Sequence, residues 1–124
     1  MMFDGLKNMA GMASMMKDLP KMQARLEQMK QELSSIRVEA ETGGGAVRVI
    51  ATGDMNVESV KIDPAMMASL VNADSPDDHR MAEELVAGAV RAAMERAREA
   101  AKTHLSNAAS EMGLPIPPGG LLGP

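Results

Sequence analysis

Apolar side chains between residues 19 and 36 recur at alternating steps of three and four positions, with polar residues between them. This spacing predicts an amphipathic helix with a heptad seam along one side. The seam consists of Leu19, Met22, Leu26, Met29, Leu33 and Ile36. Because Pro20 has no donor N–H and its ring clashes with the preceding turn, the regular helix is expected to begin at Asp18 to Pro20. The seam fits either a helix packed within a globular dimer or a two-helix coiled coil.

From Arg37 to Asp63 the pattern changes to β-branched residues that alternate with polar ones. The segments RVEAET, AVRVIAT and NVESVKI predict three short antiparallel strands. Glycines in the two connections, the GGG of TGGGAV and Gly53 beside Asp54, are expected to supply the positive φ angles of tight turns. Both faces of the middle strand are partly apolar. We therefore expect helices to cover one face of the sheet and a partner chain to cover the other.

A long helix is predicted after a short helical turn, AMMASLVN. Ser75, Pro76 and Asp78 occupy the N-cap, first-turn and N3 positions of a capping box. The helical pattern runs to Met112, where Gly113 gives a stop signal. At about 1.5 Å per residue such a helix approaches ~55 Å, well beyond the ~30 Å width of a small domain. Its far half must therefore project from the domain or pair with another chain.

These elements divide the chain into three parts. A Met-rich N-terminal segment covers residues 1–18, an α/β domain covers residues 19–113, and a tail rich in proline and glycine, expected to be disordered, covers residues 114–124. The expected fold is α+β, an α-β-β-β-α subunit with a three-stranded antiparallel sheet and long projecting helices.

The composition shows that large core-forming side chains are scarce. The chain of 124 residues has 14 methionines, no cysteine, and a single aromatic residue, Phe3. We therefore expect the protein to complete its core by oligomerising. The absence of cysteine excludes disulfides, thiol nucleophiles and thiolate-rich zinc sites, and it fits a reducing compartment. No segment approaches the roughly 18 apolar residues of a membrane span, so a cytoplasmic protein is expected.

Residues that could carry catalysis are few and isolated. His79 and His104 stand alone, without a cysteine or a second histidine at motif spacing. The acidic pairs at residues 77–78 and 83–84 are explained by their place near a helix N-terminus. TGGGAV lacks the Lys-Ser/Thr of a phosphate-binding loop and opens a strand, which favours a hairpin connection. We therefore predict no enzymatic activity, no cofactor, no metal and no small-molecule substrate.

Basic residues form two ridges on the predicted helices. The first-helix ridge consists of Lys17, Lys21 and Arg25, which step by four outside the seam. The last-helix ridge consists of Arg91, Arg98 and Lys102, and it is diluted by Glu95. Residues 1–37 carry six basic and four acidic groups, whereas the whole chain has a net charge of −4. Solvated helix faces often look like this, so the charges permit an anionic partner without establishing one.

Several strings resemble the YbaB/EbfC family of bacterial nucleoid-associated proteins, over about residues 5–119. These strings are MMKDLPKMQARLEQMKQEL, TGGGAVRVIATGDMNVESVKIDPAMM, AEELVAGAVRAAMERAREA and MGLPIPPGG. The resemblance implies an α-β-β-β-α subunit, an intertwined homodimer whose helices protrude like tweezers, and DNA binding without enzymatic activity. It also implies a role in nucleoid organisation or gene regulation. Lys17, in the Met-Lys pair of the first string, is then the best single candidate for a phosphate contact.

The residues and the resemblance together predict a homodimer of the cytoplasm and nucleoid that binds double-stranded DNA through basic groups on projecting helices. Contacts with phosphate and with DNA shape are expected to dominate. The alternative is a non-enzymatic adaptor that holds a protein partner through the Met-rich segment 1–18.

Overall fold

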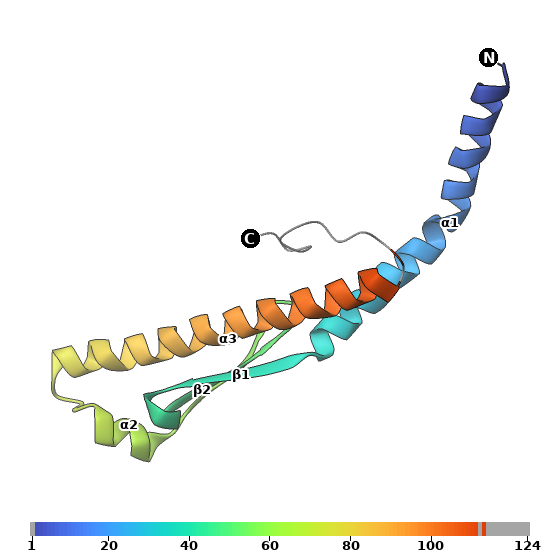
Figure 1. Cartoon of the computed structure of the whole chain (residues 1–124). Coiled ribbons are helices and arrows are strands. Elements are labelled where there is room, and N and C mark those ends of the chain that lie inside the picture. The colour runs from blue at the N-terminus through green and yellow to red at the C-terminus, as the bar shows by residue number, and fades with distance from the viewer. Residues whose placement is uncertain (1, 112, 114–124) are drawn as a thin grey trace. The chain divides into compact units, whose positions relative to one another are not determined.

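The computed structural model describes the backbone of residues 2–111 and 113, and the side chains of residues 18–111 and 113. Its elements are α1 (Met2–Ser35), β1 (Arg37–Thr42), the 3-10 turn η1 (Gly43–Gly45), β2 (Val47–Thr52), β3 (Val57–Ile62), α2 (Pro64–Leu70) and α3 (Pro76–Glu111) (Figure 1). This order confirms the predicted α+β fold and its α-β-β-β-α arrangement. The chain divides into two compact units, Met1–Glu32 and Leu33–Pro124. The expected tail at 114–124 lies outside the described residues.

Helix α1 is longer than the sequence pattern predicts. It begins at Met2 and continues through Pro20, so the expected start at Asp18 to Pro20 is wrong. A proline inside a helix removes one backbone hydrogen bond and crowds the preceding turn, but helical turns on both sides can still form. Residues 6–19 are mostly Leu, Lys, Met and Ala. These residues have high helix propensity, which favours continuation of the helix.

The three predicted strands are confirmed, and they form an antiparallel sheet in the order β1-β2-β3. Val49 of β2 lies opposite Ala40 of β1 and Val60 of β3, which fixes the register. Alternate residues of each strand point to opposite faces of the sheet. A register shift between Ile50 and Ala51 brings Val57 opposite Ala51. The inner face, which meets α3, carries Val38, Ala40, Val47, Val49, Ala51, Val57, Val60 and Ile62. The outer face carries Arg37, Glu39, Glu41, Arg48, Ile50, Ser59 and Lys61.

The glycine prediction is confirmed for one connection and wrong for the other. The three glycines of η1 have φ angles of 64°, 67° and 106°. Between β2 and β3, the residue with positive φ is Met55, at 64°, and not Gly53. Gly53 is needed for space instead, because a Cβ there would lie 2.8 Å from the backbone oxygen of Leu33 and 3.2 Å from Cβ of Ile36.

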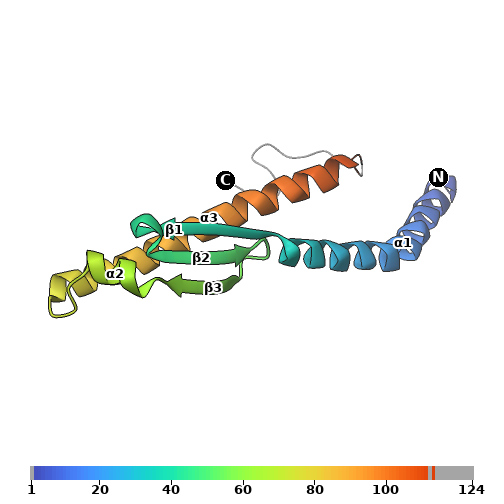
Figure 2. The same cartoon turned by 90° about the horizontal axis from the view of Figure 1, so that it is seen from below.

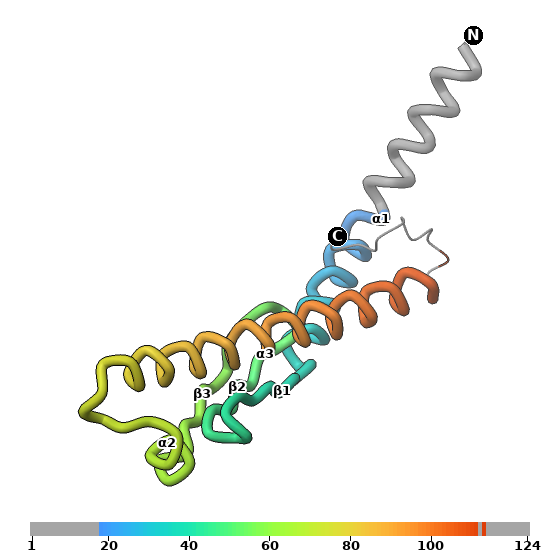
Figure 3. The backbone as a smooth tube through the Cα atoms, turned by 60° about the vertical axis from the view of Figure 1, so that its left-hand side comes forward, coloured from blue at the N-terminus to red at the C-terminus, as the bar shows by residue number. Residues whose placement is uncertain are grey.

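The core lies between α3 and the inner face of β1 and β2, and it is built from small side chains. Ala89, Ala93 and Ala97 recur every four residues along α3 and are completely buried. They belong to one cluster with Val47 and Val49 of β2, which are also completely buried. Figures 2 and 3 show α3 running along this face of the sheet. A stripe of alanines lets a helix approach a sheet closely, so small side chains fill the centre of this core, and larger ones such as Leu85 and Met94 pack at its edge.

Helix α3 begins where its capping residues predict, but the capping box is only half formed. The Asp78 N–H donates to Ser75 Oγ at 3.4 Å. The Asp78 carboxylate accepts from the backbone N–H of Asn72 at 2.6 Å, and the N–H of Ser75 donates to the Asn72 carbonyl. Asp78 therefore ties the α2–α3 connection to the helix. At the other end Gly113, with φ of 71°, donates its N–H to the Ser110 carbonyl, which confirms the predicted stop.

Candidate nucleic-acid interface

The first-helix ridge lies on α1. Lys21 is exposed and Arg25 is half-buried, and the two residues lie one helical turn apart on one side of the helix. Among the side chains that the structure describes, neither has an acidic partner within ion-pair distance. Lys17 lies in the same helix, but its side chain is outside the described residues. So are the methionine side chains on which the adaptor alternative depends.

The seam of α1 is uncovered in its first half within a single chain. Leu19, Met22 and Leu26 expose 47%, 57% and 58% of their surfaces. The later seam residues, Met29, Leu33 and Ile36, are half-buried. Contiguous exposed apolar side chains mark surfaces that associate with another apolar surface. The first half of the seam is therefore free to meet another apolar surface.

The last-helix ridge lies on the side of α3 away from the sheet. Arg91, Arg98 and Lys102 follow one another at steps of seven and four residues, which places them on one face. The buried stripe at residues 89, 93, 97 and 101 lies on a different face of the helix. Arg91 and Arg98 are exposed, and Lys102 is half-buried.

The three basic residues of this ridge differ in whether an acidic side chain already pairs with them. Arg91 forms an ion pair with Glu84 on the same helix, and both side chains are about two-thirds exposed (66% and 70%). Within residues 18–111, neither Arg98 nor Lys102 has an acidic partner at ion-pair distance. An anion that approaches Arg91 must compete with the Glu84 carboxylate. Arg98 and Lys102 are therefore the stronger candidates on α3.

Several other polar residues have structural partners. Arg96 of α3 donates a hydrogen bond to the backbone oxygen of Glu39, which fastens the helix to β1. A ring nitrogen of His79 contacts the Ala73 carbonyl, and Asp77 faces Arg80 at 3.8 Å. No group of three or more His, Cys, Asp or Glu side chains suited to a metal ion is found within the described part of the chain. No helix there combines the length and the apolarity that crossing a bilayer requires.

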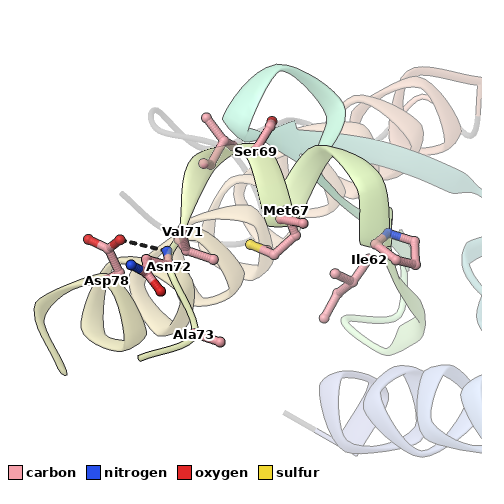
Figure 4. Close-up of a pocket in the computed structure, with 10 residues that line it drawn as sticks. Ile62, Met67, Ser69, Val71, Asn72, Ala73 and Asp78 are labelled. Atoms are coloured by element: carbon pink, nitrogen blue, oxygen red, sulfur yellow. Dashed lines mark hydrogen bonds between the residues drawn. The ribbon is translucent and has the colours of Figure 1, made fainter. Parts of the chain in front are cut away.

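An open hollow of about 850 Å³ lies between the end of β3 and α2 (Figure 4). Its apolar lining includes Ile62, Met67 and Val71, and its polar lining includes Asn72 and Asp78, which are joined by the hydrogen bond drawn in Figure 4. None of the ten residues that line it is basic. No residue of either basic ridge therefore lines this hollow.

Two features of the sheet are not evident from the sequence pattern. On the inner face of β3, Val57, Val60 and Ile62 expose 37%, 43% and 50% of their surfaces, because α3 packs on β1 and β2. On the outer face, Arg48 lies directly opposite Lys61. The alternation of apolar and polar residues along each strand was the available sequence signal for both features. Locating the exposed apolar face of β3 also required the position of α3, and locating the opposition of Arg48 and Lys61 required the strand register.

Comparison with known proteins agrees with this architecture. The family model of the YbaB/EbfC DNA-binding family matches residues 9–112. A crystal structure of an uncharacterized protein from Helicobacter pylori is similar with a TM-score of 0.52 and 18% identity, over 72% of this chain and 95% of that one. At that identity the likeness extends to the fold alone. Because the family model spans most of the chain, from α1 to the end of α3, this protein belongs to the YbaB/EbfC family of bacterial nucleoid-associated DNA-binding proteins.

Proposed function

We propose that the protein binds duplex DNA as a homodimer, through the first-helix ridge and the last-helix ridge, and that this binding organises the nucleoid or regulates genes. The observation that carries the proposal is that, in a chain of this DNA-binding family, Lys21 of α1 and Arg98 and Lys102 of α3 have no acidic partner among the side chains of residues 18–111. The two α3 cations lie on a different face from the buried stripe. Such cations can approach phosphate without disturbing the fold.

The overall charge limits how many phosphates the protein can contact. With 13 basic and 17 acidic residues, the protein as a whole does not attract DNA, so binding depends on local groups of cations such as the helix ridges. We expect each dimer to neutralise about four to six phosphates, which corresponds to a log–log salt slope of about −4 to −5. Binding should tolerate many sequences and lie near the micromolar range at physiological salt, unless several dimers load side by side.

A homodimer accounts for the apolar surface that the single chain leaves uncovered. A helix is about 10 Å wide and strands lie about 4.8 Å apart, so one helix covers about two strands. Helix α3 covers β1 and β2, and the inner face of β3 is left exposed. An apolar element of a second copy would complete this layer, and a second α1 would cover the seam. The scarcity of large apolar residues in the sequence supports the same arrangement.

The test is a charge reversal of the first-helix ridge. The K17E/K21E/R25E variant should lose the electrophoretic shift of unrelated duplexes, because three cations per chain become anions. Circular dichroism and the mass from light scattering should stay the same, since these positions lie outside the seam. Gln23→Glu, an exposed position on the same helix with no cation to lose, is the control. If the triple variant binds DNA as well as the parent does, the first-helix ridge is not the contact surface. Reversal of Arg98 and Lys102 then tests α3.

A further inference from the structure

We propose that Arg48 and Lys61, on the outer face of the sheet beside η1, bind a phosphate group of the DNA backbone. The inference rests on the proposed DNA binding and adds a contact that lies on neither helix ridge. Arg48 and Lys61 form the outer-face cation pair.

Strand register places the two cations face to face. Arg48 on β2 lies directly opposite Lys61 on β3. Like charges in directly opposed positions destabilise a sheet. Glu41 of β1 lies on the other side of Arg48, with its Oε2 at 3.4 Å from Arg48 Nε. Across the outer face, the acidic Glu41 is followed by the two basic residues Arg48 and Lys61. Arg48 is paired with Glu41, whereas Lys61 has no ion pair or hydrogen bond with any side chain of residues 18–111.

A hollow beside η1 gives an anion access to both cations. It measures about 390 Å³, and its lining includes Gly45, Arg48, Lys61 and Asp63. Gly45 has no side chain to fill the space, and Nη2 of Arg48 lies 3.5 Å from the position that a Cβ on Gly45 would take. The guanidinium can thus present its Nη donors to the hollow while its Nε faces Glu41. Asp63, the acid in the lining, already accepts the N–H of Met66 at 3.0 Å as the cap of α2.

The chemistry of the outer-face cation pair suits a phosphate. A guanidinium supplies several donors in a fixed plane, and an ammonium supplies a compact charge, so together they can contact different oxygens of one tetrahedral anion. The third cation of the outer face behaves differently. Arg37 forms a two-fold ion pair with Glu58, with Nε at 2.7 Å from Oε2. A structural ion pair therefore accounts for Arg37, but no such pair accounts for Lys61.

The experiment compares the R48Q/K61Q variant with R37Q, which removes an outer-face cation that is already paired. The affinity of each full-length protein for a 20-base-pair duplex is measured as a function of salt. The slope of R48Q/K61Q should be smaller by about 1 for each phosphate that the variant no longer neutralises, and its affinity should fall for unrelated sequences alike. R37Q should keep the slope of the parent. If R48Q/K61Q matches the parent and R37Q in slope and affinity, with unchanged circular dichroism and mass, the proposal is overturned.

A second measurement separates this site from DNA binding in general. Isotope-labelled parent protein is titrated with inorganic phosphate and with the duplex, and the amide signals of Gly45, Ala46 and Lys61 are followed by NMR. Shifts with both ligands that R48Q/K61Q abolishes support the proposal. Shifts with inorganic phosphate alone, while the duplex binds elsewhere, overturn the assignment to the DNA backbone. If the parent binds no duplex, the proposed function fails, and the absence of shifts with phosphate then overturns the site as well.

Discussion

Replacing Leu26 by aspartate tests whether the seam of α1 is a dimer contact or a solvated surface. Leu26 is the last residue of the exposed half of the seam, and it lies between Met22 and Met29 in the seam. In a single chain the new carboxylate would face water, so the variant would lose only helix propensity, under about 0.7 kcal/mol. In a dimer that buries the seam, the same carboxylate would be placed in an apolar interface. A monomer and a dimer that buries the seam therefore predict very different losses of stability for Leu26→Asp.

The size of the effect follows from the exposure of Leu26. Complete burial of a leucine side chain stabilises by about 1.5–3 kcal/mol, and 58% of Leu26 is still exposed in the single chain. Covering the rest would contribute about 1–2 kcal/mol in each chain. Desolvating the carboxylate adds a cost of about 1 kcal/mol or more per chain. Over two chains the dimer should lose at least about 4 kcal/mol, which is about a thousandfold in its dissociation constant.

The assay is sedimentation or light scattering across a concentration series, with Gln23→Asp as the matched control. Gln23 is exposed on the same helix and lies outside the seam, so its substitution introduces the same residue without touching the seam. We expect the parent and Gln23→Asp to be dimers at micromolar concentration, and Leu26→Asp to be a monomer or to unfold. Equal dissociation constants for the two variants would refute the placement of the seam. A parent that is a folded monomer would refute the dimer itself.

Two further substitutions test the packing of the sheet unit. Gly53→Ala should destabilise the protein by about 1–3 kcal/mol in denaturant unfolding, because the new Cβ would lie 2.8 Å from the Leu33 carbonyl oxygen. An unchanged midpoint of the unfolding transition would mean that this turn can shift freely. Ala93→Leu should lower the free energy of unfolding by about 1–3 kcal/mol, because Ala93 of α3 is completely buried against the sheet. A stabilised variant would instead show an unfilled space there. Ala92→Leu, a half-buried neighbour, is the comparison for helix propensity.

Local patterns were sufficient to predict the elements of the sheet unit. Alternation of β-branched residues located β1, β2 and β3 nearly to the residue, and Ser75 and Gly113 marked both ends of α3. Each of these signals acts over a few residues, so no tertiary information was needed. Pro20 was misleading for a related reason. Its cost to a helix is local and limited, and the helix-forming residues before it outweigh that cost.

Features that depend on tertiary placement were not predictable in the same way. The sequence showed that both faces of β2 are partly apolar, but it did not show that the uncovered apolar surface would lie on the inner face of β3. Arg91 forms an ion pair with Glu84, seven residues away, so its charge is less available than those of Arg98 and Lys102. Sequence spacing alone gives no reason to distinguish these three residues. The opposition of Arg48 and Lys61 required the register between two strands.

The small core and the proposed function are physically connected. A helix that meets its sheet through Ala89, Ala93 and Ala97 keeps its opposite face for polar residues, and Arg98 and Lys102 lie on that face. Within the single chain, the inner face of β3 and the first half of the α1 seam stay exposed, so the proposed homodimer would gain stability by covering them. In that homodimer the number of basic ridges that one DNA molecule can meet would double. Because each ridge alone holds few cations, the proposed second copy would raise phosphate affinity through multivalency, and we predict that dimerisation and DNA binding weaken together when the seam is disrupted.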